Sequence, residues 1–397
     1  MSNLNVGRLT ATGSVKLPVY TTANLPAGEE GLTVYDSTEK TIKYYDGTQW
    51  VAAGSGGKKT ASITISNPTG TATTNIPVKV KISASTSGST GDFGDVKFYS
   101  DSAATTTLSY WRETFVSDSY AEFWVKIPTF PSGGATIYAQ KSNSNTYTGT
   151  SSSVFLYYNT GDNVTNWQVR HGTMTTNGTV IIKTGAGGSA ANETNAWYTT
   201  AESDTEWSNY IWEYDTRRET SGGYDYPWAS VRVRNPSASS VTKWWYEGSD
   251  GSGNTWRPYS SGSDGGWIST NSNNSNIGRG ISNNWERHYL ICSNNVGKVF
   301  WSTNTFGTAD NATTFGFGHW DYASQTTNPQ SFVQQQNYAF SSGYLNQGAY
   351  GTIALDNHSG ASPTMKFKNL LVRKTFTLNA SDTSTSLTPT VTISSFV

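Results

Sequence analysis

The chain has 397 residues, of which 14% are charged and 13% are aromatic, and its formal net charge is -1. This balance supplies no basic field, so we expect neither nucleic acid nor an anionic membrane as a partner. The 15 Trp, 23 Tyr and 39 Gly favour strands and turns, whereas good helix formers are scarce. The composition predicts an all-β protein, and the length predicts two or three compact units.

The chain carries one cysteine, Cys292, and therefore no intrachain disulfide. Its richness in Gly, Ser, Thr and Asn is nevertheless typical of proteins that work outside cells. The N-terminal sequence MSNLNVGRLTATGSVKLP has no apolar secretion core, and no stretch is long and apolar enough to span a bilayer. We therefore expect a protein that folds in a reducing cytosol, later works outside the cell and does not insert into a membrane.

Residues 1–56 form the first predicted unit. Residues 1–18 show no amphipathic period and are expected to form an extended arm that orders against a partner. Two short strands are predicted next, over 32–35 and 41–45, each followed by a polar turn. A hairpin this small is marginally stable alone, and the sequence AAGSGGKK that follows it is typical of a flexible linker. The unit is expected to need docking or oligomerisation.

The text LPAGEEGLTVYDSTEKTIKYYDGTQWV resembles a segment near the start of many tailed-phage structural proteins, including fibre and head-decoration proteins. The resemblance covers residues 16–52. It implies attachment to other virion proteins, or oligomerisation, through residues 1–56. The residues expected to carry this role are Tyr35, Tyr45, Asp46, Gly47 and Trp50. The alternative is a generic hairpin, because short turn motifs recur by chance.

Five segments after the linker alternate apolar and polar residues with the period of a strand. They span residues 61–66, 76–82, 96–98, 121–127 and 135–140. The sequences NPTGT, ASTSGSTGDFGD and FPSGG lie between them and are rich in turn residues. This pattern predicts antiparallel sheets with one face on a core.

Residues 57–160 resemble an uncharacterised domain family that precedes or embraces concanavalin-like modules in secreted prokaryotic and viral proteins. The resemblance rests on NIPVKVKI, GDFGDVKFYSD, LSYWRETF, AEFWVKIPTF and ATIYAQ, in that order. The text VFLYYNTGDNVTNWQVRHGT resembles the passage into the lectin-like part, and MKFKNLLVRKTF with LTPTVTI resembles the closing strand. The chain departs from the family at IYAQKSNSN, where a Tyr-Gly-Asn sequence is usual. The family implies a fold and an adhesive context, and it implies no reaction.

Residues 161–397 are predicted to form a concanavalin A-like β-sandwich of the jelly-roll type, with closing strands at the C-terminus. Two long segments, 234–283 and 302–347, are poor in regular alternation and are expected to be loops at the sandwich edge, where recognition is often built. The first of these loops and the stretch before it combine aromatic residues with Asp, Asn and Arg. This mixture suits sugars, because a pyranose stacks on a ring and hydrogen-bonds through its hydroxyls.

The candidate glycan-binding residues are Tyr224, Tyr226, Trp228, Trp244, Trp245, Trp256, Tyr259 and Trp267. The alternative is that these rings fill the sandwich core or a subunit interface, since aromatic residues dominate both.

The text AESDTEW places Glu202, Asp204 and Glu206 on one face of a possible strand. This spacing resembles the Glu-x-Asp-x-Glu signature of family-16-like glycoside hydrolases, which would make Glu202 the nucleophile and Glu206 the acid/base. The residues between the carboxylates are Ser203 and Thr205, where that family favours apolar ones. A simpler interpretation of this sequence is that the three acidic residues lie on a solvated face, so we expect the protein not to be an enzyme.

The four histidines are scattered, one cysteine cannot build a zinc site, and no phosphate-binding loop or nucleophile elbow is present. The oxygen-rich pair Asp162-Asn163 gives no calcium signal beyond chance, so no metal or cofactor is expected. The sequence therefore predicts a phage structural protein at the virion surface, made in the host cytoplasm and assembled as a homotrimer. Its sandwich is expected to touch host-surface polysaccharide. The alternatives are a glycan-cleaving depolymerase and a purely stabilising capsid decoration.

Overall fold

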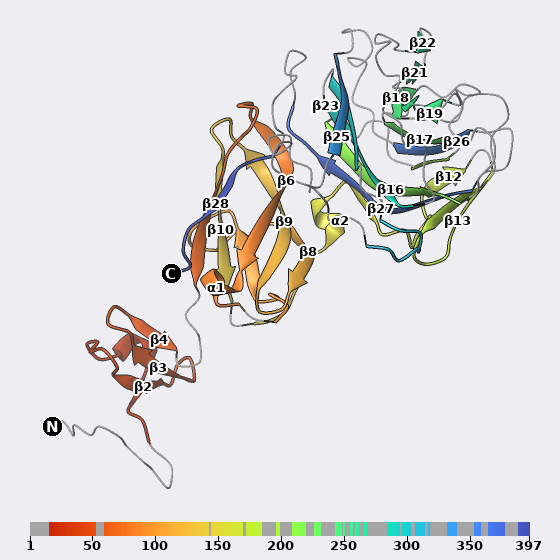
Figure 1. Cartoon of the computed structure of the whole chain (residues 1–397). Coiled ribbons are helices and arrows are strands. Elements are labelled where there is room, and N and C mark those ends of the chain that lie inside the picture. The colour runs from red at the N-terminus through yellow and green to blue at the C-terminus, as the bar shows by residue number, and fades with distance from the viewer. Residues whose placement is uncertain are drawn as a thin grey trace.

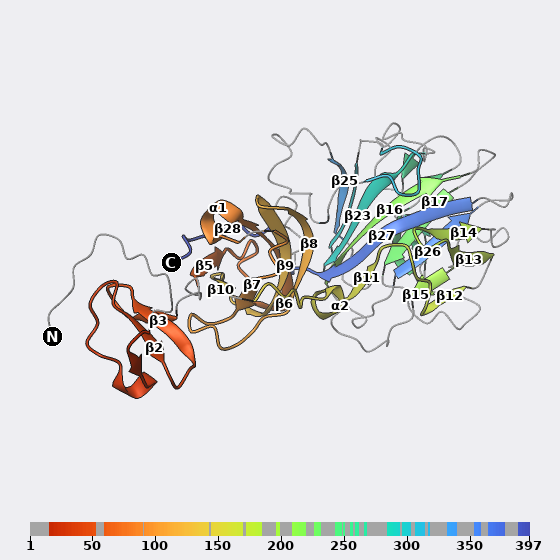
Figure 2. The ribbon, with the colours of Figure 1, turned by 90° about the horizontal axis from the view of Figure 1, so that it is seen from below.

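The computed structural model is built almost entirely of strands, as the sequence predicts, with antiparallel pairing in every sheet except at one edge (Figure 1). It describes residues 16–52, 59–89, 91–142, 144–169, 172–184, 196–198, 209–219, 226–231, 243–247, 249–250, 255–256, 259–261, 266–267, 284–293, 296–302, 306–313, 317, 332–339, 353–358, 364–377 and 388–397. Seen from below, a small N-terminal sheet, a first sandwich and a larger second sandwich follow one another (Figure 2).

The N-terminal unit is a four-stranded sheet in the order β1-β2-β3-β4. Its strands are β1 (Val19–Tyr20), β2 (Thr33–Asp36), β3 (Thr41–Tyr45) and β4 (Trp50–Ala52), and a short 3-10 helix, η1, spans Thr22–Asn24. Strands β2 and β3 confirm the predicted hairpin to within one residue. The sheet is larger than that hairpin because β1 adds to β2 in parallel and β4 adds to β3.

The first sandwich packs a four-stranded sheet, β28-β5-β10-β7, against a three-stranded sheet, β6-β9-β8. The elements are β5 (Thr60–Ile65), β6 (Thr73–Ser83), α1 (Ala84–Ser87), β7 (Val96–Tyr99), β8 (Tyr110–Val116), β9 (Tyr120–Phe130), β10 (Ala135–Lys141) and β28 (Val391–Ile393). Alternation explains the core: Ile63 and Ile65 from one sheet and Ile76, Val78 and Val80 from the other are all buried.

The C-terminal segment closes the first sandwich. Strand β28 pairs with β5, and Val397 and Thr60 exchange backbone hydrogen bonds of 2.9 and 3.2 Å. The sequence-based division assigns this segment to the unit 161–397, although the resemblance of LTPTVTI to the family's closing strand implies one composite unit over 57–397. In the structure the segment forms the edge of the sheet built by residues 60–141. The chain therefore leaves the first sandwich, builds the second and returns.

Truncating the Phe396 side chain tests whether the C-terminal segment is part of the first sandwich. Its side chain is buried in the core of the first sandwich, so Phe396→Ala should lower the free energy of unfolding by about 3–5 kcal/mol. Phe115, which is 43% exposed, provides a matched control that should lose only about 0.5 kcal/mol. Denaturant unfolding of the full chain measures both. Equal losses in the two variants would mean that the C-terminal segment is not part of the core.

The second sandwich has an eight-stranded and a seven-stranded sheet. The first contains β11 (Tyr157–Asn159), β13 (Thr173–Thr176), β14 (Ile181–Thr184), β16 (Tyr210–Arg218), β23 (Glu286–Ser293), β24 (Val296–Ser302), β25 (Phe332–Ala339) and β27 (Thr364–Lys374). The second contains β12 (Trp167–Val169), β15 (Ala196–Tyr198), β17 (Tyr226–Val231), β18 (Lys243–Glu247), β21 (Tyr259–Ser261), β22 (Gly266–Trp267) and β26 (Ile353–His358), and β19 (Ser249–Asp250) pairs with β20 (Thr255–Trp256). Trp212, Leu290, Leu355, Phe367 and Val372 are fully buried in its core.

The two sandwiches meet around the short helix α2 (Ser151–Val154) and a buried carboxylate, Glu113. Glu113 accepts hydrogen bonds from the indole of Trp124 (2.8 Å) and from the backbone N–H of Phe317, and it pairs with Lys79 (3.0 Å). Lys79 in turn donates to the carbonyl of Phe317 (2.9 Å). Since Trp124 and Lys79 lie in the first sandwich and Phe317 lies far along the chain, this polar cluster and its aromatic surroundings join the two sandwiches.

Candidate functional site

The acidic residues considered for catalysis, Glu202, Asp204 and Glu206, lie outside the described residues. One glycan-binding candidate, Tyr224, also lies outside the described residues. The other seven lie on strands: Tyr226 and Trp228 on β17, Trp244 and Trp245 on β18, Trp256 on β20, Tyr259 on β21 and Trp267 on β22. Strands β18 to β22 therefore interrupt the loop predicted over residues 234–283. The side chains of these seven residues lie outside the described part of the structure.

Four of the predicted attachment residues, Tyr45, Asp46, Gly47 and Trp50, form the turn between β3 and β4 and its flanks. The rings of Tyr45 and Trp50 meet edge to face with centroids 5.7 Å apart, and the Trp50 indole donates to the Pro26 carbonyl (3.2 Å). Asp46 accepts hydrogen bonds from the backbone N–H groups of Thr48 and Gln49 (2.9 and 2.8 Å), while Gly47 has a φ of +98°. The YDGTxW pattern is thus a tight turn whose conformation requires glycine.

Tyr35 differs from the other attachment candidates. It is half-buried on the opposite face of the sheet, next to Val19 and Ile42 in the strand register. No comparison tests attachment, which stays a prediction for all five residues.

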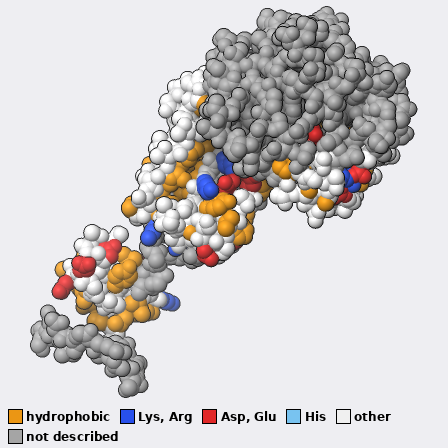
Figure 3. Space-filling model, viewed as in Figure 1, with side chains coloured by type: hydrophobic (Ala, Val, Ile, Leu, Met, Phe, Trp, Pro, Cys, Tyr) orange, Lys and Arg blue, Asp and Glu red, His pale blue; other side chains and the backbone are white. Residues whose placement is uncertain are grey.

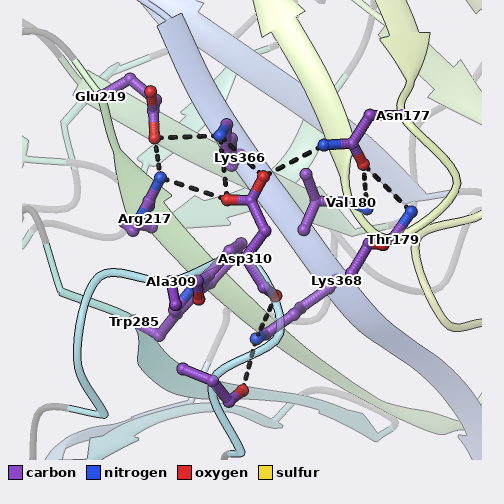
Figure 4. Close-up of polar contacts among 11 residues, drawn as sticks. Asn177, Thr179, Val180, Arg217, Glu219, Trp285, Ala309, Asp310, Lys366 and Lys368 are labelled. Atoms are coloured by element: carbon purple, nitrogen blue, oxygen red, sulfur yellow. Dashed lines mark hydrogen bonds and ion pairs between the residues drawn. The ribbon is translucent and has the colours of Figure 1, made fainter.

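A charged cluster around Asp310 holds a loop against the second sandwich (Figure 4). Lys366 pairs with both carboxylate oxygens of Asp310 (2.9 and 3.0 Å), and Arg217 and Asn177 bind the same carboxylate (3.2 and 3.0 Å). Lys368 donates to the carbonyls of Asp310 and Ala312 (2.8 and 2.6 Å). Burial opposes ionisation of Asp310, but these hydrogen bonds and positive charges hold the pKa of its carboxyl below its ordinary value. Every charge here has a protein partner, so the cluster fixes the loop.

A second charged network lies beside the first, and its central residues Glu213, Asp215 and Arg287 are fully buried. The Arg287 guanidinium contacts Asp215 (3.2 Å) and Glu213 (3.4 Å), and Glu213 also accepts from Arg373 (2.8 Å). Asn369, whose φ of +50° marks a bulge in β27, donates to Asp215 (2.6 Å). Burial disfavours the charged guanidinium, but the neighbouring carboxylates outweigh it and raise the pKa of Arg287. Arg287 and its two carboxylate partners are therefore held together within the protein.

A cleft between the edges of the two sheets is the site best suited to a ligand. Its cavity volume is about 310 Å³, at the lower end of the range of about 300–1,000 Å³ found for ligand pockets. It is lined by Ser151, Ser152, Phe155, Leu156, Tyr157, Tyr158, Asn159, Asp162, Asn163, Thr165, Asn166 and Tyr198. Rings form its floor and amide, hydroxyl and carboxylate groups form its rim, because Asp162, Asn163 and Asn166 are exposed whereas Phe155 and Tyr157 are buried.

The rings of the cleft are held in place from both sheets. Tyr157 and Tyr158 lie on β11, which pairs with β27 of the eight-stranded sheet, and Tyr198 lies on β15 of the seven-stranded sheet. The Tyr198 and Tyr157 rings are 4.3 Å apart, and Tyr158 packs on Trp111 at 4.9 Å. Tyr158 and Tyr198 are only half-buried, so each keeps part of its ring available for stacking.

Asn159 holds the loop at the rim of the cleft in place through its side-chain hydrogen bonds. Its amide donates to the Tyr157 hydroxyl (2.7 Å) and to the Asn163 carbonyl (2.5 Å), and its carbonyl oxygen accepts from the Gly161 N–H (2.7 Å). Gly161 has a φ of +116°, and a Cβ there would meet the Thr179 carbonyl at 2.4 Å, so glycine is required. These contacts fix the loop that presents Asp162 and Asn166.

Burial raises the pKa of two phenols that line the cleft, those of Tyr157 and Tyr158. It raises the pKa of Tyr158 to about 12, with a further contribution from the Glu113 carboxylate, and raises that of Tyr157 to about 12 against the hydrogen bonds from Trp167 and Asn159. Both remain neutral hydrogen-bonding groups throughout the physiological pH range.

A titration checks this protonation. The pKa of Tyr158 is raised above its ordinary value of 10.0, so the folded protein holds the phenol proton to a higher pH than the unfolded chain does. The protonated Tyr158 therefore contributes fully to stability below pH 10. That contribution is lost between about pH 10 and 12. Tyr158→Phe should remove absorbance from the late tyrosinate phase near pH 12 and leave the main phase near pH 10 unchanged. Loss from the main phase instead would mean that Tyr158 is freely solvated.

Among the described residues, no group of His, Cys, Asp or Glu has the arrangement of a metal site. The same part of the chain contains no helix long and apolar enough to cross a membrane.

Residues 92–170 match a family model described as a domain of unknown function (DUF2341). The match runs from the loop before β7 to the end of β12, and so covers the second half of the first sandwich, the junction and the cleft residues from Ser151 to Asn166. None of the curated protein sequences compared with the chain matches it significantly.

Several solved structures are similar to the chain at low identity. The alginate lyase from Klebsiella pneumoniae is 9% identical over 52% of this chain and 86% of its own, with a TM-score of 0.31. The binding domain of botulinum neurotoxin DC, solved in complex with rat synaptotagmin II, is 10% identical over 58% and 50%, with a TM-score of 0.32. Trypanosoma rangeli sialidase is 9% identical over 68% of this chain, which spans only 40% of that enzyme, with a TM-score of 0.31.

Sequence reasoning missed the cleft. The text VFLYYNTGDN does place three rings directly before an Asn- and Asp-rich turn, which is the same combination that drew attention to residues 224–267. Tyr198, which also lines the cleft, lies about forty positions further along the chain. The pairing of β12 with β15, in which Trp167 is opposite Tyr198, brings Tyr198 to the cleft.

Proposed function

We propose that the protein is a non-enzymatic structural component of a tailed-phage particle, exposed at the virion surface, which binds host-surface glycan through the cleft at Tyr158 and Tyr198. Residues 1–56 attach it to the particle. It is made in the host cytoplasm and incorporated during assembly.

The cleft is the observation that carries the binding proposal. Two half-buried tyrosines supply apolar faces for a pyranose ring, and Asp162, Asn163 and Asn166 supply hydrogen-bonding groups at the rim. Its rings and rim loop are fixed by contacts within the protein, so binding would order few side chains.

The charge of the lining indicates the class of sugar. Among the described lining residues, Asp162 is the only charged one. A carboxylate repels uronic and sialic acids and attracts an ammonium group, so neutral or amino sugars are the expected ligands. Arg287 and Lys366 do not alter this expectation, because each is ion-paired with a carboxylate of the protein.

The virion assignment is supported by the resemblance of residues 16–52 to the start of phage structural proteins and by the ordered N-terminal sheet that those residues form. The single cysteine and the Gly-, Ser- and Asn-rich surface are consistent with a protein that folds in the cytosol and works outside it.

Binding of the full chain to an array of bacterial surface glycans tests the proposal. We expect retention on neutral or amino-sugar glycans and none on uronate-rich or sialylated ones, with no release of shorter saccharides during prolonged incubation. Release of shorter saccharides would establish the depolymerase instead, and Glu202→Gln and Glu206→Gln would then show whether that acidic strand is responsible. Absence of any binding would leave a purely stabilising decoration, and absence of the protein from purified particles would refute the virion assignment.

A further inference from the structure

One ring of the cleft is supported by the first sandwich. The Tyr158 ring packs on the ring of Trp111 with centroids 4.9 Å apart, and Trp111 lies on β8 of the first sandwich. Trp111 is not among the residues that line the cleft. It can therefore act on a ligand in the cleft only through the residues that it contacts.

Two further rings hold the pair formed by Trp111 and Tyr158. Phe155, which also lines the cleft, lies 5.5 Å from Trp111 and 6.2 Å from Tyr158. Phe317 lies 5.8 Å from Tyr158 and 6.4 Å from Trp111. Aromatic pairs at such separations stabilise one another beyond the burial of their surfaces. The orientation of Tyr158 is thus set by a cluster of four rings.

A second part of the cleft is anchored to the same strand. Ser151 and Ser152 lie on α2 and line the cleft. The backbone N–H of Thr150, directly before α2, donates to the carbonyl of Tyr110 on β8 (3.1 Å). Strand β8 therefore holds the cleft at two points, through a backbone hydrogen bond at Tyr110 and through the side chain of Trp111.

Ion pairs fix the strand that carries Trp111. Glu113, two residues further along β8, pairs with Lys79 (3.0 Å), and Lys79 also pairs with Glu122 (2.8 Å). The space-filling view shows basic and acidic side chains together on the first sandwich near the junction (Figure 3). Glu113 also accepts a hydrogen bond from the backbone N–H of Phe317. The strand and the segment that carries Phe317 are thus joined at the ring cluster.

The region matched by the family model spans this contact. It covers residues 92–170, and so contains Trp111 from the first sandwich together with Phe155 and Tyr158 from the second. The matched unit therefore crosses the junction between the two sandwiches and does not end at it.

We propose that Trp111 is a positioning residue for the glycan site, through which the first sandwich sets the orientation of the Tyr158 ring. This inference rests on the proposed glycan binding and extends it, because none of the glycan-binding residues predicted from the sequence lies in the first sandwich. The two sandwiches then form one binding unit.

Isothermal titration of the full chain with the best glycan from the array tests the proposal. Trp111→Ala should weaken binding by about three- to tenfold, because Tyr158 loses the ring that holds it. Trp111→Phe should bind within about twofold of the wild type, since a phenyl ring keeps an aromatic contact. Val80→Ala is the matched control, because Val80 is buried in the core of the first sandwich and does not line the cleft; its affinity should be unchanged.

Titration of the tyrosines provides a second measurement that needs no glycan. Burial raises the pKa of Tyr158 to about 12, and Trp111 contributes to that burial through its contact with the ring. In Trp111→Ala the ionisation of Tyr158, identified by its loss in Tyr158→Phe, should move from about pH 12 toward pH 10. In Trp111→Phe and Val80→Ala it should stay near pH 12.

Three results would overturn the positioning role of Trp111. They are an unchanged ionisation of Tyr158 in Trp111→Ala, an unchanged glycan affinity in that variant, and equal weakening of binding in Trp111→Ala and Val80→Ala. If the wild type binds no glycan, the proposed function fails, and the ionisation of Tyr158 still decides whether Trp111 holds this ring.

Discussion

Replacing Arg287 by methionine should lower the free energy of unfolding by about 3–5 kcal/mol. The substitution keeps most of the side-chain volume but removes the positive charge between Glu213 and Asp215, both of which are fully buried. Glu213 would retain Arg373, whereas Asp215 would lose the guanidinium that lies 3.2 Å from its carboxylate. Denaturant unfolding at neutral pH measures the loss.

Arg112 is the matched control for this substitution. It forms an ion pair of 3.1 Å with Asp92, whose side chain is 39% exposed and stays hydrated when the pair is broken. Arg112→Met should therefore cost clearly less than Arg287→Met. Adding Asp215→Asn to Arg287→Met should recover part of the loss, because it removes a buried charge. A loss of less than about 1 kcal/mol for Arg287→Met would contradict the buried network.

Removing the Tyr198 ring should weaken glycan binding at least tenfold, which corresponds to about 1.4 kcal/mol. Tyr198 is half-buried and lines the cleft, and the proposed site uses the part of its ring that faces the cleft. Isothermal titration with the best glycan from the array compares Tyr198→Ala with the wild type.

Tyr138→Ala controls for the loss of a half-buried tyrosine far from the cleft, since Tyr138 lies on β10 of the first sandwich. Its affinity for the glycan should equal that of the wild type. Equal weakening in both variants would indicate a general loss of folding, and unchanged affinity in Tyr198→Ala would place the ligand elsewhere.

Local patterns predicted much of the fold. Period-two alternation in TASITI and NIPVKVKI placed Ile63, Ile76 and Val78 on a core face, and the Asp46-Gly47 turn followed from the conformations that glycine adopts. These features are set by residues close together in the chain, which is why the sequence reveals them.

Features that depend on distant pairings were not predictable in this way. The pairing of β28 with β5 joins segments more than three hundred residues apart, as the Thr390 to Ser66 hydrogen bond shows. The isolated text around Arg287 gives no sign that its partners lie more than seventy positions earlier. The cleft belongs to the same group, because its rings come from two sheets whose strand order the sequence does not display.

The structure of the full chain with its best glycan bound is the most direct test of the central claim. We predict the saccharide in the cleft, with one ring against Tyr158 or Tyr198 and hydroxyls within hydrogen-bonding distance of Asp162, Asn163 or Asn166. A saccharide bound instead over strands β17 to β22, where Trp228, Trp244 and Trp267 lie, would contradict the cleft assignment and restore the site first indicated by the aromatic residues of the sequence.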